Sequence, residues 1–267
     1  MRRSPLIVGH RGDSAHAPEN TLAAFHTAIE AGADGIEFDV RISKDGVPVI
    51  IHDPDLGRTG CRPESVSSLT ARELASIDVG SWFNRRFPKL AQPSFAGQTV
   101  PTLAQVLNSL TDYDGLVYIE LKAGKTGQRE LVQAVCDVIH DSPLLKQVVV
   151  KSFKLGMIPI VRQTVPEVQT AALFEPVILD FLRRRKYLID LANELGAHQL
   201  SLHHRLVTRK LTALAEAAKM PLTVWTVDDR KWLQRAQKLN IGAIITNDPG
   251  KMLLGRNSKY GHATEST

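Results

Sequence analysis

The sequence contains very little cysteine, with Cys61 and Cys136 as the two cysteines in 267 residues. They lie far apart and in no spacing that holds a metal ion, so the sequence supports neither a disulfide framework nor a zinc site. Such sparse usage fits a reducing compartment, and we expect the protein to be cytoplasmic.

Long hydrophobic runs are also absent. No stretch approaches the roughly 18 apolar residues that a membrane-spanning helix requires. Near the N-terminus the apolar run is only Leu6-Ile7-Val8, which is too short for the core of a signal peptide. We therefore expect no stable insertion into a membrane.

Charge of one sign is only slightly in excess, since the formal net charge is +5. An excess of this size indicates a solvated surface rather than a particular function. The densest basic run, Arg183-Arg184-Arg185-Lys186, has no interleaved aromatic residues and belongs to no nucleic-acid-binding motif. We interpret it as an exposed helix face and expect no nucleic-acid partner.

Short apolar runs alternate with amphipathic stretches of helical length. The runs are near-continuously apolar, as is typical of parallel strands that are covered on both faces. The alternation predicts an α/β protein with one catalytic domain over residues 1–254, a (β/α)8 TIM barrel. The eight expected strands are Leu6–His10, Gly35–Val40, Val117–Leu121, Val148–Ser152, Thr170–Phe174, Gln199–Leu202, Leu222–Val227 and Ala243–Thr246. The clearest helices are Asn20–Glu30, Gln128–Ile139, Thr208–Ala218 and Asp229–Lys238, with Thr208 and Asp228 as expected N-caps.

An open, doubly wound sheet is the alternative architecture for such an alternation. That fold normally has a glycine-rich phosphate-binding turn after its first strand. Here the turn reads Gly9-His10-Arg11-Gly12, which does not match that pattern. The barrel is therefore favoured.

One segment interrupts the alternation after the second strand. Asp45-Gly46 is a hairpin turn signal, so we expect Phe38–Ser43 to pair with Val47–His52 and to place Asp39 opposite or nearly opposite His52. Residues from about 53 to 100 are predicted to form a small insertion, after which Pro101-Thr102-Leu103 starts a helix. The polar residues 255–267 are predicted to be a disordered tail.

Acidic side chains occur at the predicted carboxyl ends of the strands, where a TIM barrel has its active site. Glu37 and Asp39 are two residues apart on one strand, so both point to the same side, and Glu120 and Lys122 have the same relation. Three carboxylates at one barrel mouth would repel one another without a cation among them. A set of oxygen ligands suits one hard divalent ion, Mg²⁺, Ca²⁺ or Mn²⁺, and the choice among the three stays open.

The charges and histidines near these carboxylates indicate phosphodiester chemistry. A divalent ion, Arg11 and Lys122 together carry one more positive charge than the three carboxylates carry negative charge. This excess matches the single negative charge of a phosphodiester. His10 and His52 flank the same place and suit general acid and base catalysis, because neutral imidazole and imidazolium coexist near pH 7. We interpret the remaining candidates His16, His203 and His204 as structural.

Several motifs follow one another in a recognisable order. They resemble the signatures of the glycerophosphodiester phosphodiesterase family, and the resemblance extends from about residue 6 to residue 250. The opening signature is Gly9-His10-Arg11-Gly12 with Ala17-Pro18-Glu19-Asn20-Thr21, and the second is Glu37-Phe38-Asp39-Val40 with Val49-Ile50-Ile51-His52-Asp53. Ile119-Glu120-Leu121-Lys122 and Val224-Trp225-Thr226-Val227 follow.

The resemblance implies a TIM barrel with a small insertion after strand two, and metal-dependent hydrolysis of glycerophosphodiesters through a cyclic phosphate. The products implied are glycerol 3-phosphate and an alcohol. The implied site comprises Glu37, Asp39 and Glu120 as metal ligands, His10 and His52 as the acid/base pair, Arg11 and Lys122 on the phosphate, and Trp225 against the glycerol.

Two positions depart from the family pattern. The last strand is followed by Thr246-Asn247-Asp248-Pro249, where the family often has Thr-Asp-Arg-Pro. His16 stands where a larger aromatic or an apolar residue is expected. The roles of Asn247 and His16 therefore stay open.

Two other functions are weighed against this one. A lysophospholipase D-type activity on lipid substrates predicts an exposed apolar lip on the insertion, for which Trp82, Phe83, Phe87 and Phe95 are candidates, although they equally fit a covered small core. A non-catalytic phosphodiester-binding protein predicts the loss of a metal ligand or a histidine, and none of the five is lost. The alcohol head group and the oligomeric state stay open.

Overall fold

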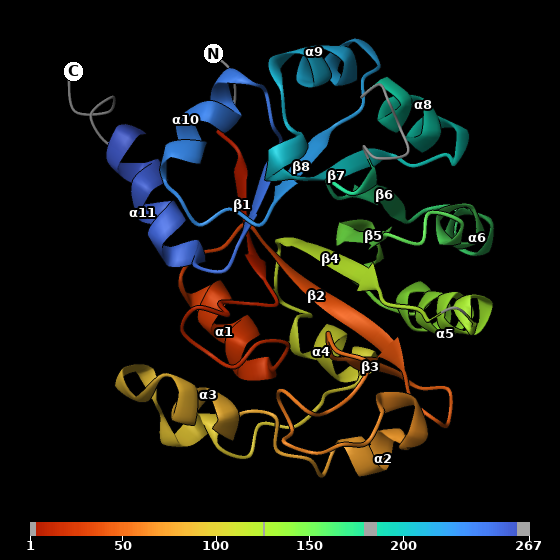
Figure 1. The fold of residues 1–267 in the computed structure, drawn as a ribbon, viewed down its shortest axis with the longest axis vertical. Helices are drawn as coiled ribbons and strands as arrows, with labels where there is room; N and C mark the ends of the chain where they lie inside the picture. The colour runs from red at the N-terminus through yellow and green to blue at the C-terminus, as the bar shows by residue number, and fades with distance from the viewer. Residues whose placement is uncertain (1–3, 125, 179–185, 261–267) are drawn as a thin grey trace.

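The computed structural model describes residues 4–124, 126–178 and 186–260, and within them eight parallel strands close into a barrel (Figure 1). The strand order is β1-β9-β8-β7-β6-β5-β4-β2, and β1 pairs with β2 to complete the ring. The predicted (β/α)8 barrel is thus confirmed. The barrel strands are β1 Leu6–His10, β2 Gly35–Ile42, β4 Leu116–Leu121, β5 Val148–Ser152, β6 Gln169–Phe174, β7 Gln199–His203, β8 Leu222–Trp225 and β9 Ala243–Thr246.

Helices surround the barrel and cover the outer faces of its strands (Figure 1). This covering explains why strands such as β9 are buried along their whole length and have near-continuous apolar sequences. The helices around the barrel are α1 Leu22–Glu30, α4 Leu103–Ser109, α5 Gln128–His140, α6 Met157–Thr164, α8 Lys186–Glu194, α9 Arg209–Ala217, α10 Lys231–Lys238 and α11 Pro249–Tyr260, with short 3-10 turns at Leu145–Gln147 and His204–Leu206.

Threonine side chains fix the starts of several helices. Thr21, Thr102 and Thr208 each accept a hydrogen bond from a backbone N–H in the first turn of α1, α4 and α9. The prediction for Thr208 is therefore confirmed. The prediction for Asp228 is wrong, because α10 begins only at Lys231 and the Asp228 carboxylate instead accepts hydrogen bonds from the end of β9.

The predicted hairpin is present. Strand β3, Pro48–Ile50, runs antiparallel to β2, with Val40 opposite Ile50. The backbone N–H of Ile51 donates to the carbonyl of Asp39 over 3.0 Å. Ile51 therefore faces Asp39, and His52 is the next residue. This agrees with the prediction that His52 lies nearly opposite Asp39.

Residues 53–100 form a compact excursion beside the barrel, and we call these residues the insertion. It contains α2 Ala71–Leu74 and α3 Ser81–Arg86 (Figure 1), with 3-10 turns at Val66–Ser68, Pro88–Leu90 and Pro93–Phe95. A small core of its own joins it to the hairpin, and that core comprises Val49, Ile51, Leu56, Val66, Leu74, Ile77, Val79 and Val100. A second cluster, in which Phe83 and Phe95 pack with Ala17 and Ala24, joins the insertion to α1 and the turn before it.

The polar C-terminal stretch differs from its prediction. Residues 255–260 continue helix α11 rather than forming a disordered tail. The helix is held by the buried side chains of Met252 and Leu253 and by an ion pair between Arg256 and Asp34. Residues 261–267 lie outside the described residues, as do Arg183, Arg184 and Arg185 of the basic run.

A membrane-spanning segment is also not found in the described ranges, where every helix is either too short or too polar to cross a bilayer.

Candidate active site

Three carboxylates meet at the carboxyl ends of two neighbouring strands. Glu37 and Asp39 extend from β2, Glu120 extends from β4, and the sheet register places Asp39 beside Glu120. All three side chains are buried, and one oxygen from each lies within 4.8 Å of the others. The structure therefore brings together the residues predicted to hold a metal ion.

Two cations that the sequence predicted lie against this cluster. Arg11 Nε is 3.1 Å from Asp39 Oδ2, and Lys122 Nζ is 3.4 Å from Asp39 Oδ1. Lys122 also pairs with Glu120. Burial opposes ionisation of Asp39, but the charges of Arg11 and Lys122 outweigh it and hold the pKa of that carboxyl well below its usual range.

A third cation, Lys151 at the end of β5, has no role in the sequence prediction. Its Nζ lies 2.8 Å from Glu37 Oε1 and 3.9 Å from Glu120 Oε2, and only 2% of the residue is exposed. The signal that could have found it is the strand order, because β5 lies next to β4 in the barrel and the register pairs Lys151 with Glu120.

The donor set fits a hard divalent cation. Within the described part of the chain, the ammonium groups of Lys151 and Lys122 are the groups that contact Glu37 Oε1, Asp39 Oδ1 and Glu120 Oε1. Burial, and next the charge of Asp39, raises the pKa of Glu120 to about 7. A carboxyl that resists ionisation beside two other buried carboxylates is stabilised in its charged form when a cation lies among the three oxygens.

The turn after β1 positions one side of this cluster. The backbone N–H of Arg11 donates to Glu37 Oε2 over 3.1 Å, and Asn20 Nδ2 donates to Asp39 Oδ2 over 2.9 Å. Arg11 and Asn20 both have positive φ, near 57° and 58°, a conformation that costs non-glycine residues some stability. The strained backbone of the Gly9-His10-Arg11-Gly12 turn thus lies at the site itself.

The two predicted catalytic histidines have different partners. His10 Nδ1 lies 2.7 Å from Asn247 Oδ1, whereas His52 Nδ1 lies 2.7 Å from the carboxylate of Asp53. Burial lowers the pKa of His10 and so favours its neutral form. The carboxylate of Asp53 instead holds the ring of His52 in one orientation.

An outer ion-pair network connects the two histidine sides of the site. Arg11 pairs with Glu19 at 2.7 Å, and Arg58 pairs with both Glu19 at 2.7 Å and Asp53 at 2.6 Å. Glu19 belongs to the opening signature, and neither Glu19 nor Arg58 had a predicted role. Their contacts hold Arg11 and the partner of His52 in place.

Aromatic rings form one wall of the barrel mouth. Trp225 makes edge-to-face contacts with Phe153, with 5.5 Å between ring centroids, and with His203, at 5.2 Å. Lys122 Nζ lies 5.6 Å from the centre of the Phe153 ring, which places this wall beside the carboxylate cluster. His203, interpreted from sequence as structural, therefore belongs to the mouth.

The sequence model of the glycerophosphoryl diester phosphodiesterase family matches residues 10–251. The chain belongs to this family. It is 32% identical over 251 residues to a glycerophosphodiester phosphodiesterase of Caldanaerobacter subterraneus subsp. tengcongensis, covering 93% of this chain and 96% of the relative. The enzyme class is thus that of a glycerophosphodiester phosphodiesterase.

Solved structures share the fold. A glycerophosphodiester phosphodiesterase from Agrobacterium tumefaciens superposes with a TM-score of 0.74 at 26% identity, over 94% of this chain and 99% of that one. A phosphodiesterase from Oleispira antarctica superposes with a TM-score of 0.82 at 24% identity, over 95% and 97%. That structure contains the product sn-glycerol-3-phosphate.

The two departures from the family pattern have different positions in this phosphodiesterase. Asn247 is at the site, because its side chain meets His10. His16 makes a local contact, with Nδ1 2.8 Å from Asp13 Oδ1. Asn247 therefore lies beside a predicted catalytic residue, while His16 contacts the turn after β1.

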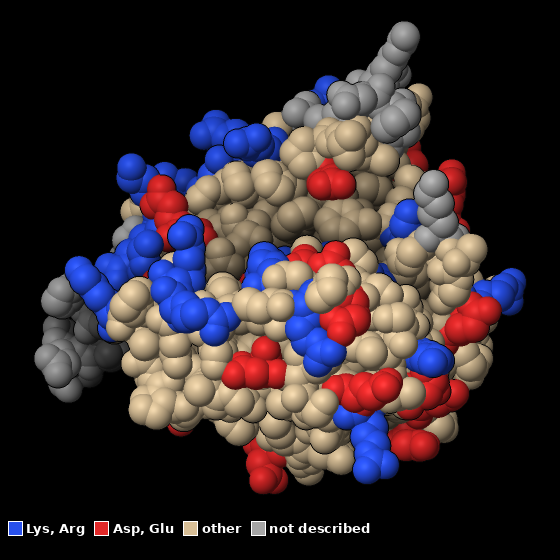
Figure 2. Space-filling model, turned by 60° about the horizontal axis from the view of Figure 1, so that its bottom comes forward, with Lys and Arg blue, Asp and Glu red and all other residues tan. Residues whose placement is uncertain are grey.

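The surface around the recess in Figure 2 carries Lys and Arg side chains interspersed with Asp and Glu. On that face, positively charged side chains therefore lie next to negatively charged ones. In salt solution, dissolved ions screen such exposed charges from one another beyond roughly 10 Å.

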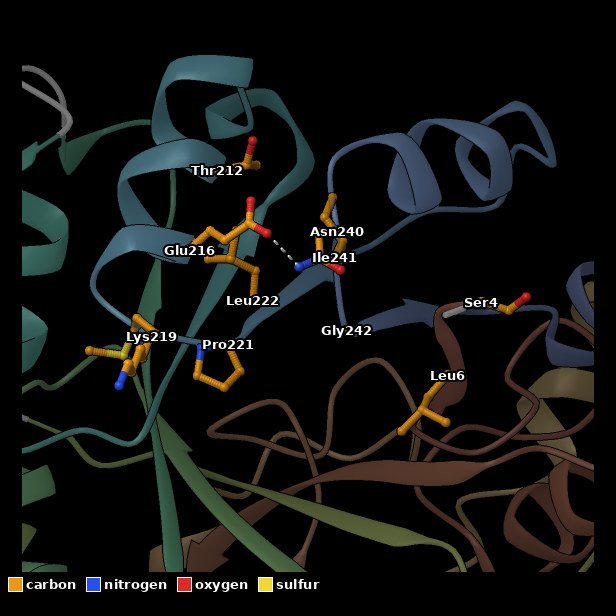
Figure 3. Close-up of a pocket in the computed structure, with 11 residues that line it drawn as sticks. Ser4, Leu6, Thr212, Glu216, Lys219, Pro221, Leu222, Asn240, Ile241 and Gly242 are labelled. Atoms are coloured by element: carbon orange, nitrogen blue, oxygen red, sulfur yellow. Dashed lines mark hydrogen bonds between the residues drawn. The ribbon is translucent and has the colours of Figure 1, made fainter. Parts of the chain in front are cut away.

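A separate pocket of about 490 Å³ opens near the other end of the barrel strands (Figure 3). Leu6 and Leu222 begin β1 and β8, and both line it, as do Pro221 and Gly242. Glu216 and Asn240 are hydrogen-bonded to each other on its wall. Active sites of TIM barrels lie at the carboxyl ends of the strands, so this pocket is not the catalytic site.

Proposed function

We propose that this enzyme hydrolyses glycerophosphodiesters to glycerol 3-phosphate and an alcohol, with one divalent cation held by Glu37, Asp39 and Glu120. The observation that carries the proposal is the buried carboxylate cluster, whose oxygens lie within 4.8 Å of one another beside Arg11 and Lys122. The sn-glycerol-3-phosphate in the Oleispira antarctica relative supports the product assignment.

Each group around the cluster has a task in this reaction. When bound, the cation supplies Lewis-acid stabilisation of the negative charge that develops on the phosphate oxygens. Arg11 and Lys122 are the cations suited to bind the same phosphate, since their charged ends already face the carboxylates. Trp225 offers an apolar face for the carbon atoms of the glycerol.

Proton transfer divides between the two histidines. Neutral His10 takes the proton from the glycerol hydroxyl next to the phosphate, and the resulting alkoxide attacks phosphorus. The bond from phosphorus to the leaving alcohol breaks, and that oxygen takes a proton from His52, whose ring is held in place by Asp53. Water then opens the cyclic phosphate with the two roles reversed.

The lysolipid alternative receives less support from the insertion. Phe83 and Phe95 are buried, and Trp82 is partly covered, with the guanidinium of Arg58 5.8 Å from its ring centre. Among these four aromatic residues only Phe87, which is 40% exposed, could contribute to an apolar lip. The aromatic residues thus mainly form a covered core, which favours the water-soluble diester as the substrate.

The test is release of glycerol 3-phosphate from glycerophosphocholine, first with EDTA and then with Mg²⁺, Ca²⁺ or Mn²⁺ added back. We expect EDTA to abolish release and at least one ion to restore it, while the Glu120→Gln variant stays inactive or needs far more metal. A lysolipid assay in detergent runs in parallel. No release with any ion, together with hydrolysis of the lysolipid, would favour the alternative substrate, and inactivity on both would favour a binding protein.

We also propose a reducing compartment. Cys61 is exposed on the insertion and Cys136 is buried in α5, and neither forms a disulfide. Thiol titration of unfolded protein purified without reductant should therefore find both cysteines free.

A further inference from the structure

A line of hydrogen bonds leads from His10 to the surface. His10 Nδ1 lies 2.7 Å from Asn247 Oδ1, and Asn247 Nδ2 donates to Asp228 Oδ2 over 2.8 Å. Asp228 follows β8 and Asn247 follows β9, so two neighbouring barrel strands supply this line. In the described chain no hydrogen bond or ion pair joins Asp228 to the three carboxylates of the cation site.

The amide of Asn247 can take only one orientation here. A carboxylate has acceptors and no donor, so the side of Asn247 that faces Asp228 must be its NH₂ group. Its oxygen then faces His10, and the hydroxyl of Ser14 donates to that same oxygen over 3.1 Å. An amide oxygen can only accept, so the neutral His10 ring carries its proton on Nδ1 and keeps Nε2 free.

Asp228 is itself held in place, although it is exposed. Its Oδ1 accepts from the backbone N–H of Asn247 and from the hydroxyl of Thr246, each over 2.8 Å. Together with the Asn247 side chain, these contacts occupy both carboxylate oxygens with donors from the end of β9. The carboxylate is therefore an anchored acceptor rather than a mobile surface charge.

We propose that Asp228 is a positioning residue, which through Asn247 selects the His10 tautomer whose free Nε2 accepts the proton from the glycerol hydroxyl. The proposal rests on the proposed function, in which His10 is the base of the first step. Asp228 touches neither substrate nor cation and acts only by fixing which way the Asn247 amide points.

Two single substitutions and their combination test this relation. In Asp228→Asn, an NH₂ group faces the NH₂ group of Asn247. Rotation of the Asn247 amide removes this clash of two donors. The rotated amide then places the proton of His10 on Nε2. In Asn247→Asp two carboxylates face each other. The double variant Asp228→Asn/Asn247→Asp restores an alternation of donor and acceptor with the same atoms exchanged.

We expect Asp228→Asn to lower kcat by roughly tenfold or more, up to the factor of about 10²–10⁴ that the general base itself contributes, while KM and the cation affinity stay unchanged. Asn247→Asp should also be impaired, and the double variant should recover most of the lost kcat. Nitrogen-15 NMR of labelled histidine, with His10 assigned from a His10→Gln sample, should show the Nδ1–H tautomer in the parent and double variant and less of it in Asp228→Asn. Thermal melting confirms that each variant is folded.

Outcomes against the inference differ from outcomes against the proposed function. If the parent protein cleaves the diester and Asp228→Asn keeps its kcat and its tautomer, the positioning role is wrong. If the double variant is folded but its kcat is as low as that of the single variants, the alternation of donor and acceptor does not determine kcat. If the parent releases no glycerol 3-phosphate, the proposed function fails, while the NMR spectra still decide whether Asp228 sets the tautomer.

Discussion

Lys151 Nζ lies 2.8 Å from Glu37 Oε1, and both side chains are buried. Without a divalent cation, the three carboxylates of the site therefore face three cations, Arg11, Lys122 and Lys151. Lys151 partly occupies the electrostatic position that a metal ion would take. We therefore expect Lys151 to stabilise the metal-free protein and to compete with a bound cation.

Replacing this lysine should separate those two effects. In Lys151→Met, Glu37 loses its buried partner, and we expect the metal-free protein to lose about 3–5 kcal/mol of unfolding free energy. Divalent cations should bind roughly tenfold more tightly or better, because one competing charge is gone. Urea unfolding and isothermal titration calorimetry measure the two quantities. Lys154→Met, at an exposed position three residues later, is the control and should change neither. Unchanged cation affinity in Lys151→Met would contradict the competition.

The pKa of Glu120, raised to about 7, predicts a pH-dependent response to metal. Between its ordinary value of 4.5 and about 7, the folded metal-free chain holds a proton on this carboxyl that the unfolded chain has lost. The contribution of Glu120 to unfolding free energy therefore falls as pH rises through this window. A bound cation removes that penalty, so the increase in Tm on adding metal should be larger at pH 8 than at pH 5.5. In Glu120→Gln the increase should be smaller and less dependent on pH, and an equal pH dependence in both proteins would exclude Glu120 as the cause.

The histidine roles predict large losses of activity without loss of fold. His10→Ala and His52→Ala should each lower kcat by about 10²–10⁴-fold, because each removes one proton-transfer group. His26→Ala, at an exposed position on α1, should retain full activity. Diester hydrolysis and a thermal melt of each variant provide the measurement. Near-normal kcat in either of the first two variants would remove that residue from the mechanism.

Gly12 allows a stability prediction with an internal control. Its φ is 81°, and a Cβ there would lie 2.5 Å from the backbone of Ala24. Gly32 has a similar φ of 83° but open space around it. We expect Gly32→Ala to cost about 1–2 kcal/mol from backbone strain alone. Gly12→Ala should cost a further 1–3 kcal/mol, roughly, from overpacking against α1. Equal losses in urea unfolding would show that the turn can move away from α1.

The barrel could be predicted because its strands are buried on both faces. Near-continuous apolar runs such as Ala243–Thr246 are easily recognised, and the observed strand has the same bounds. The carboxylates could be predicted because alternation within a strand puts Glu37 and Asp39 on one side. Which neighbours would surround them depends on strand order, and for that reason Lys151 was missed.

Side chains whose partners are remote in sequence were harder to predict. Asp228 precedes a helical stretch and looks like an N-cap, but its partners Thr246 and Asn247 come from the next strand. The residues after Gly255 look like a polar tail, but Arg256 finds Asp34 more than 200 residues earlier in the chain. Local sequence contains no signal for either contact, because both depend on the closure of the barrel.

The insertion begins directly after His52 and has its own small core, whereas the carboxylates lie on β2 and β4. Most of the insertion therefore folds around contacts that do not include the carboxylates, whereas Asp53 and Arg58 at its start belong to the ion-pair network beside them. Exchange of residues 59–100 between relatives should leave that network and the charge balance of the carboxylates unchanged.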